Sequence, residues 1–259
     1  MKISLCGKGG SGKSVLTSLL ANQAISHGFH VLVVDSDESN SGLFRMLGFK
    51  EPPVPFMDLL GGKKKLKERL SQRNVLREDH FFIEDIPSRH IAKRDNLMLV
   101  SIGKILQAFE GCACPMGVLS REFLKKLRLN RDEIAFVDME AGVEHFGRGI
   151  DEAIDHVLLV VEPSFESLSI AGKIKELTSG MDKAVYAILN KIDSEETAHR
   201  LEDELKARGI EIIGTVPMDP LIFKACLEGH LVAGGEAFHA AGEILDAILD
   251  KPVKSRVDG

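Results

Sequence analysis

Apolar and polar positions along this chain follow two alternating patterns. Short continuous apolar runs rich in Val, Ile and Leu predict strands buried on both faces, and apolar residues spaced three or four apart predict helices between them. The predicted strands are Lys2–Cys6, His30–Asp35, Asn96–Ile102, Glu133–Val137, His156–Val161, Ala184–Leu189 and Glu211–Ile213. The predicted helices are Lys13–His27, Leu119–Leu127, Ser164–Leu177, Glu195–Arg208, Ala237–Leu249 and a segment around Cys226. This alternation predicts an α/β fold, with a single doubly wound, mostly parallel sheet that carries helices on both faces.

The chain is expected to form one domain. Its 259 residues contain no internal repeat, no low-complexity tract and no linker-like change of composition, and α/β domains of this size are commonly undivided. Residues 50–95, which contain several prolines, form the least regular region. We therefore expect a domain over residues 1–250, followed by a flexible tail over residues 251–259.

Charge and composition exclude several classes of partner. A net charge of -6 argues against a nucleic-acid-binding surface, and the absence of Trp removes the usual stacking platform for single strands. The basic run at residues 63–69 fits a solvated helix face. No apolar stretch reaches the roughly 18 residues that cross a bilayer, and the first residues lack a signal-peptide pattern. We expect a cytoplasmic protein that binds neither nucleic acid nor membrane.

A glycine-rich loop joins the first predicted strand to the first predicted helix. Residues 7–14, GKGGSGKS, match the phosphate-binding P-loop G-x-x-x-x-G-K-[ST] in the strand–loop–helix context that it requires. Lys13 is expected to reach the β- and γ-phosphates, and the Ser14 hydroxyl to ligate Mg²⁺. The expected ligands are ATP or ADP, with Mg²⁺. The residues whose backbone would surround the phosphates are Gly9, Gly10, Ser11 and Gly12.

A second lysine in this loop indicates a particular group of P-loop proteins. With Lys8, the loop reads K-G-G-x-G-K-S, which resembles the deviant Walker A motif of the MinD/ParA/nitrogenase-iron-protein group of P-loop ATPases. The resemblance implies hydrolysis of ATP to ADP and phosphate by a homodimer. It also implies that both lysines take part in catalysis. Lys13 would contact the nucleotide of its own chain, and Lys8 would contact the partner's nucleotide, where other NTPases use an arginine finger.

Acidic residues end two of the predicted buried strands. Asp35 and Asp37 end the second strand, and Asp138 begins the segment D-M-E-A-G that reaches Gly142. Ligands bind at the carboxyl ends of such strands. The resemblance places Asp37 near the attacking water, Asp35 near the magnesium shell and Asp138 on Mg²⁺ through a water. It makes Gly142 a hinge that offers its N–H to the γ-phosphate. For Asp35 or Asp37, helix capping is the alternative.

The segment N-K-I-D, residues 190–193, follows another predicted strand. The Asn190 amide can pair with adenine N6 and N7, whereas N-K-x-D is also the guanine-reading motif of GTPases, in which the aspartate would be Asp193. The early lysine favours the group that uses ATP, so we expect Asn190 to read adenine. By the same resemblance, Pro217 belongs to the loop that closes over the base.

Two cysteines, Cys112 and Cys114, form a C-x-C motif. Residues i and i+2 of an extended segment point to the same side, so both thiolates could bind one ion. A closed thiolate site needs four ligands, and a two-fold dimer supplies the other two. Four thiolates suit Ni²⁺ or Zn²⁺. We expect such an ion at the dimer interface, and two ordinary cysteines are the alternative.

The segment at residues 138–149, DMEAGVEHFGRG, and the C-x-C that precedes it resemble the CooC-type nickel-insertion ATPases of carbon monoxide dehydrogenase maturation. This resemblance implies a homodimeric metallochaperone that couples ATP-driven dimerisation to nickel delivery into carbon monoxide dehydrogenase or a related nickel enzyme. The alternative is a MinD/ParA-like ATPase switch that acts in spatial organisation or partner binding without metal. A membrane organiser would need a basic amphipathic helix at its end, and residues 237–250 are acidic instead.

Overall fold

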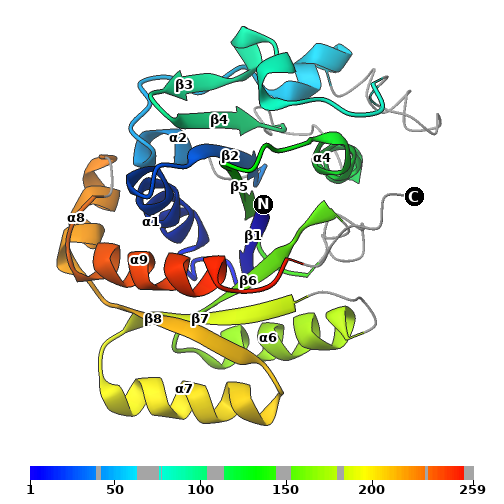
Figure 1. Cartoon of the computed structure of the whole chain (residues 1–259). Coiled ribbons are helices and arrows are strands. Elements are labelled where there is room, and N and C mark those ends of the chain that lie inside the picture. The colour runs from blue at the N-terminus through cyan, green and yellow to red at the C-terminus, as the bar shows by residue number, and fades with distance from the viewer. Residues whose placement is uncertain are drawn as a thin grey trace.

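The computed structural model describes residues 1–38, 42–62, 76, 78–103, 114–143, 153–179, 184–230 and 233–253. An eight-stranded sheet of order β3-β4-β2-β5-β1-β6-β7-β8 forms its centre (Figure 1). β3 pairs antiparallel with β4, and the other described pairings are parallel. The predicted doubly wound, mostly parallel sheet is confirmed. The strands are β1 (Lys2–Gly7), β2 (His30–Ser36), β3 (Ala92–Arg94), β4 (Leu97–Ser101), β5 (Glu133–Met139), β6 (His156–Val161), β7 (Ala184–Ile192) and β8 (Glu211–Pro217).

The helices also follow the predicted pattern. Three of them have N-termini capped by side chains: Ser164 for α6, Ser194 for α7 and Asp219 for α8, each accepting a backbone N–H from the first turn. Within the described residues, no helix is long and apolar enough to cross a membrane. Short 3-10 helices occupy Phe56–Leu60, Ile83–Asp85 and Ser88–His90. The α-helices are α1 (Lys13–Ser26), α2 (Leu43–Met46), α4 (Cys114–Lys126), α6 (Phe165–Thr178), α7 (Glu195–Ala207), α8 (Pro220–Glu228) and α9 (Glu236–Leu249).

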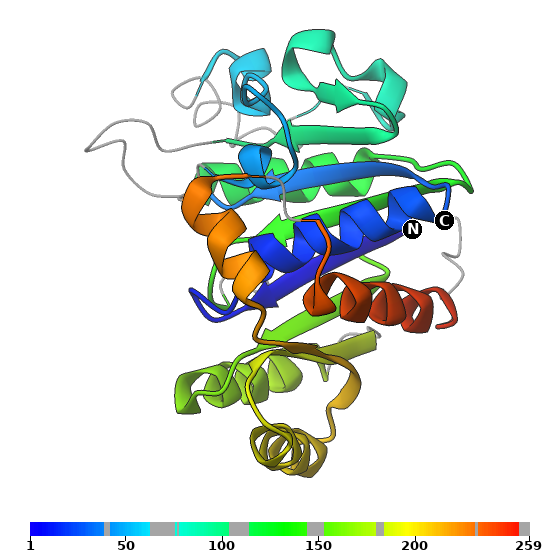
Figure 2. The same ribbon diagram turned by 90° about the vertical axis from the view of Figure 1, so that its left-hand side faces the viewer.

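Helices cover the sheet on both faces, as Figure 2 shows for α1 and α9 on one of them. Successive residues of one strand belong to different cores because side chains in a strand alternate between faces. On β2, Val31 and Val33 belong to the core that includes residues of α1 and α9, whereas Leu32 and Val34 belong to the core on the other face, which includes residues of α4, α6 and α7. The continuous apolar runs of the sequence are therefore explained by burial on both sides.

The structure corrects two details. α4 begins at Cys114 and not at Leu119. Pro115 suggests a break, but a proline is accepted in the first turn of a helix because the N–H it lacks has no intrahelical partner there. Cys114 thus starts a helix, and the extended segment expected for the C-x-C does not hold for it. β3 was not predicted, since three residues that include Lys93 and Arg94 carry no apolar run.

Some sequence predictions fall outside the described residues. They concern Cys112, the whole basic run at residues 63–69, residues 144–149 of the DMEAGVEHFGRG segment and the last part of the predicted tail, at residues 254–259.

Candidate functional site

The glycine-rich loop lies at the carboxyl end of β1 and leads into α1. Gly7, Gly10 and Gly12 have φ values of 139°, 81° and 97°, a region that residues with a Cβ rarely adopt. A Cβ on Gly7 would lie 2.6 Å from the backbone oxygen of Val160, and one on Gly12 would collide with the Asn190 amide. The glycines are therefore needed to let this loop curl tightly against residues of β6 and β7, with its backbone at the helix start where an anion binds.

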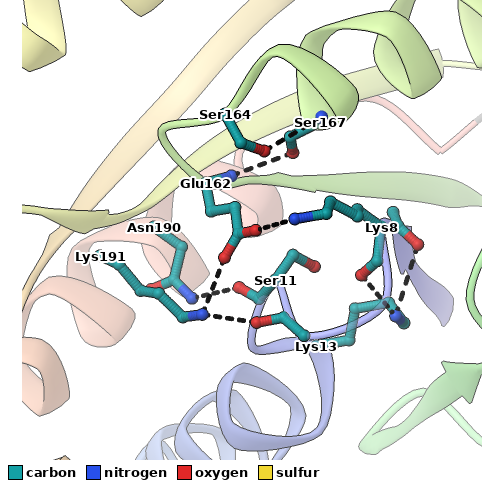
Figure 3. Close-up of polar contacts among 10 residues, drawn as sticks. Lys8, Ser11, Lys13, Glu162, Ser164, Ser167, Asn190 and Lys191 are labelled. Atoms are coloured by element: carbon teal, nitrogen blue, oxygen red, sulfur yellow. Dashed lines mark hydrogen bonds and ion pairs between the residues drawn. The ribbon is translucent and has the colours of Figure 1, made fainter.

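The two lysines of the loop point in different directions (Figure 3). Lys13 folds back over the loop, and its Nζ donates to the carbonyl of Lys8 at 3.0 Å and of Gly7 at 3.4 Å. Lys8 leaves the loop instead, and its Nζ donates to Glu162 Oε1 at 2.6 Å. Of the two loop lysines, only Lys13 thus lies over the phosphate-binding loop of its own chain.

Asp138 ends β5 beside the loop and is fully buried, at 0% exposure. The Ser14 hydroxyl donates to its Oδ2 at 2.6 Å, while Oδ1 has no hydrogen-bond partner. Burial raises the pKa of Asp138 to about 7; the Ser14 hydrogen bond opposes the rise, and the charge of Asp35 adds to it. Such a carboxyl is costly to ionise unless a cation arrives.

Asp35 and Asp37 stand at the end of β2, the strand next to β5. Asp35 pairs in register with Asp138, and its Oδ1 accepts the Asp37 N–H at 3.2 Å. The predicted acidic residues are thus brought together with Ser14. The Ser14 hydroxyl and the Asp138 carboxylate, whose buried Oδ1 has no partner, are hard oxygen donors of the kind that Mg²⁺ prefers, so these two residues fit the expected ion.

Gly142 also lies against the loop. Its N–H donates to the Gly7 carbonyl at 3.2 Å, and its φ is 101°. The positive φ agrees with a hinge. The N–H that the resemblance assigns to the γ-phosphate is here bonded to the loop itself, so that role stays a prediction.

An apolar pocket of about 550 Å³ adjoins the loop. Asn190 and Pro217, the residues expected around the base, both line it, together with Gly12. Asn190 Nδ2 donates to the Ser11 carbonyl at 2.7 Å, which ties the end of β7 to the loop. Asp193 is exposed and lies just before the N-cap of α7. The pocket suits a flat, mostly apolar ring, and the choice of base stays a prediction.

The C-x-C motif is only partly described, because Cys112 lies outside the described residues and only the backbone position of Cys114 is known. Among the described residues, no three or more His, Cys, Asp or Glu side chains form a group that could hold a metal ion by themselves. α4, which starts at Cys114, nevertheless contacts the carboxyl end of β2: the Ser120 hydroxyl lies 2.8 Å from that of Ser36, the residue between Asp35 and Asp37 in the sequence.

Two residues of the site were not singled out from the sequence. Glu162 follows β6, and Lys191 follows Asn190; the Lys191 Nζ donates to Glu162 Oε2 at 2.8 Å and to the Gly10 carbonyl. The position of Glu162 directly after a buried parallel strand is the signal that could have found it, by the rule that found Asp35 and Asp138.

Comparisons with known proteins agree with this site. Residues 3–232 match the CobQ/CobB/MinD/ParA nucleotide binding domain. The chain is 43% identical to the ATP-binding protein MJ0084 of Methanocaldococcus jannaschii, over 89% of this chain and 93% of that one. It is 32% identical to the carbon monoxide dehydrogenase accessory protein CooC of Rhodospirillum rubrum, over 86% of this chain and 85% of that one.

A solved structure shows the same fold. The septum site-determining protein MinD of Pyrococcus horikoshii, solved with Mg-ADP, superposes with a TM-score of 0.71 at 20% identity, over 96% of each chain. The family match, the relatives and the solved structure all indicate the same family of nucleotide-binding proteins. The chain belongs to the CobQ/CobB/MinD/ParA nucleotide-binding family and is a P-loop ATPase.

Proposed function

We propose that two copies of this chain close around ATP, and that closure and hydrolysis drive nickel delivery into carbon monoxide dehydrogenase or a related nickel enzyme. The observation that carries the proposal is the direction of Lys8. It belongs to the phosphate-binding loop, yet its Nζ points out of the loop to Glu162, while Lys13 covers the loop. A second lysine that does not serve its own loop is available to a partner's nucleotide.

In the proposed hydrolysis of ATP, the residues of the chain position the nucleotide and the attacking water and stabilise charge. The loop N–H groups and Lys13 hold the phosphates, and Ser14 with Asp138 would hold Mg²⁺, which when bound offsets phosphate charge. Asp37 orients a water whose oxygen attacks the γ-phosphorus, as the bond to the β–γ bridging oxygen breaks and ADP leaves. Lys8 of the partner supplies further positive charge to the phosphates.

Coupling to metal is supported by α4. Ser120 contacts Ser36, which is the residue between Asp35 and Asp37 in the sequence, and it lies six residues, about 9 Å along the helix axis, from Cys114. At its other end α4 is anchored, because Lys2 Nζ donates to the carbonyls of Leu124 and Leu127. A shift of the β2 end on nucleotide binding would therefore reach the cysteine pair. The nickel client follows from the resemblance and from the name of the CooC relative.

A MinD/ParA-like switch without metal is the second candidate. It is favoured by exposed apolar side chains on and before α8, where Met218, Leu221, Phe223 and Leu227 are each more than half exposed. Exposed apolar side chains gathered in this way suit a protein partner.

Lys8→Ala and Lys13→Ala test the ATP-driven dimer. Lys13→Ala should lose tight MgATP binding. Lys8→Ala should bind MgATP about as well as the unchanged protein but should not dimerise with it, as measured by analytical ultracentrifugation and by ATP turnover. Lys93→Ala, an exposed lysine on edge strand β3, is the matched control. A Lys8 variant that dimerises and turns over normally would refute the proposal.

A further inference from the structure

One carboxylate connects the two loops that embrace the nucleotide site. Glu162 Oε1 accepts Lys8 of the phosphate-binding loop at 2.6 Å, and Oε2 accepts Lys191 of the base loop at 2.8 Å (Figure 3). The Glu162 side chain is 14% exposed, against 30% for Lys8 and 41% for Lys191. The carboxylate is thus the least exposed member of a triad in which two cations share it, one on each oxygen.

The backbone holds this carboxylate in place. The Glu162 N–H donates to the Ser167 hydroxyl at 3.1 Å, and the Ser167 N–H donates to the N-cap Ser164 at 3.2 Å. Glu162 is therefore fixed at a strand–helix junction, near the positive end of α6. Burial opposes its ionisation, but hydrogen bonds from Lys191 and Lys8 outweigh burial and hold the pKa of Glu162 below its usual value.

If the Lys8 Nζ turned to a partner's phosphates, it would leave Glu162 Oε1. If Glu162 had Lys8 alone, release of Lys8 would strand a carboxylate that is mostly shielded from water, which is unfavourable. Lys191 changes this balance, because it stays on Oε2 when Lys8 leaves Oε1.

We propose that Glu162 is a positioning residue that holds Lys8 within its own protomer and releases it to the partner's nucleotide, with Lys191 remaining as the counter-ion. This inference rests on the proposed ATP-driven dimer. It makes Glu162 the residue that sets how readily the dimer forms.

The first test is Glu162→Gln, which keeps the shape and removes the charge. In the monomer without nucleotide, the Lys8 amine should react faster with acetic anhydride, by about threefold or more, because the carboxylate that raises the pKa of Lys8 is gone. Labelling of Lys8 is read by mass spectrometry. Glu166→Gln is the matched control, since Glu166 is an exposed carboxylate four residues further on that acts on Lys8 only through its charge.

The second test compares Glu162→Gln with a substitution of Lys191, the cation on the other carboxylate oxygen. In saturating MgATP, Glu162→Gln should lower the dimer Kd by about threefold or more, whereas Lys191→Met should raise it and slow the labelling of Lys8, because Glu162 then has Lys8 alone. A merely structural role for Glu162 would make both variants dimerise less well. Glu162→Asp, which keeps the charge on a shorter side chain, should lie between Glu162→Gln and the unchanged protein.

The outcomes separate the two proposals. Unchanged Lys8 labelling in Glu162→Gln overturns the contact itself, whatever the dimer does. Faster labelling with an unchanged or higher dimer Kd overturns the role of Glu162 in dimerisation. If the unchanged protein does not dimerise with MgATP at all, the proposed function fails, and this inference fails with it even where the labelling result holds.

Discussion

Replacing Asp138 with asparagine should change how the stability of the protein depends on pH. The carboxyl is fully buried, with Ser14 on one oxygen and no hydrogen-bond partner on the other. Burial raises its pKa to about 7 from an ordinary 3.8. Asparagine keeps the shape and an acceptor for Ser14 but cannot lose a proton. The substitution therefore isolates the cost of ionising this group.

The sign and size follow from proton binding. Between an ordinary pKa of 3.8 and a folded pKa of about 7, the folded protein holds a proton that the unfolded chain has lost. Stability therefore falls as pH rises through this window. From about pH 5.5 to about pH 8, the loss in free energy of unfolding is about 2 kcal/mol. The asparagine variant lacks this loss.

Urea unfolding without nucleotide or magnesium, at several pH values, measures the effect. The quantity to compare is the difference in free energy of unfolding between the variant and the unchanged protein. Burial also lowers the pKa of His156, so the stability of both proteins rises with pH up to the ordinary histidine pKa of 6.5. This effect is the same in both proteins and cancels in the difference. Relative to the unchanged protein, the free energy of unfolding of Asp138→Asn should rise by about 2 kcal/mol between about pH 5.5 and about pH 8. The control Asp203→Asn, at an exposed position on α7, should show no such relative rise. A difference that stays constant with pH would refute the reasoning.

Three further predictions concern the nucleotide. Lys13→Ala should weaken MgATP binding by about a hundredfold or more in calorimetry, since this lysine covers the loop; near-normal affinity would contradict its role. Asp193→Ala should leave the preference for ATP over GTP unchanged in competition binding, because Asp193 is exposed at a helix start, and a clear preference of the unchanged protein for GTP would overturn the adenine prediction. Gly12→Ala should lower both nucleotide affinity and melting temperature, because φ is 97° and the new Cβ would meet Asn190; an unaffected variant would contradict this packing.

Much of this fold could be predicted because its signals are local. Buried parallel strands leave continuous apolar runs, and the P-loop needs fixed residues at fixed spacing between a strand and a helix. Asp35 and Asp138 could be placed side by side because parallel strands end at one edge, and they do pair in register. These inferences require no knowledge of distant contacts.

What the sequence could not provide depends on three-dimensional partners. Lys8 and Glu162 form a hydrogen bond although they are 154 positions apart in the sequence. No sequence pattern predicts which of several carboxylates a lysine contacts. β3 exists because β4 offers an edge, although two of its three residues, Lys93 and Arg94, are charged. The raised pKa of Asp138 results from burial by segments that are remote in sequence.

The central claim, that a nucleotide-driven dimer controls a metal bound by the C-x-C motif, is tested most directly by titrating the purified protein with Ni²⁺ and Zn²⁺, with and without MgATP. The account predicts one ion for each pair of chains and an affinity that changes with nucleotide. The Cys112→Ser, Cys114→Ser double variant should lose the ion, while Cys226→Ser should keep it. An ion bound to each single chain and retained in the double variant, or a metal affinity that is the same with and without MgATP, would contradict it.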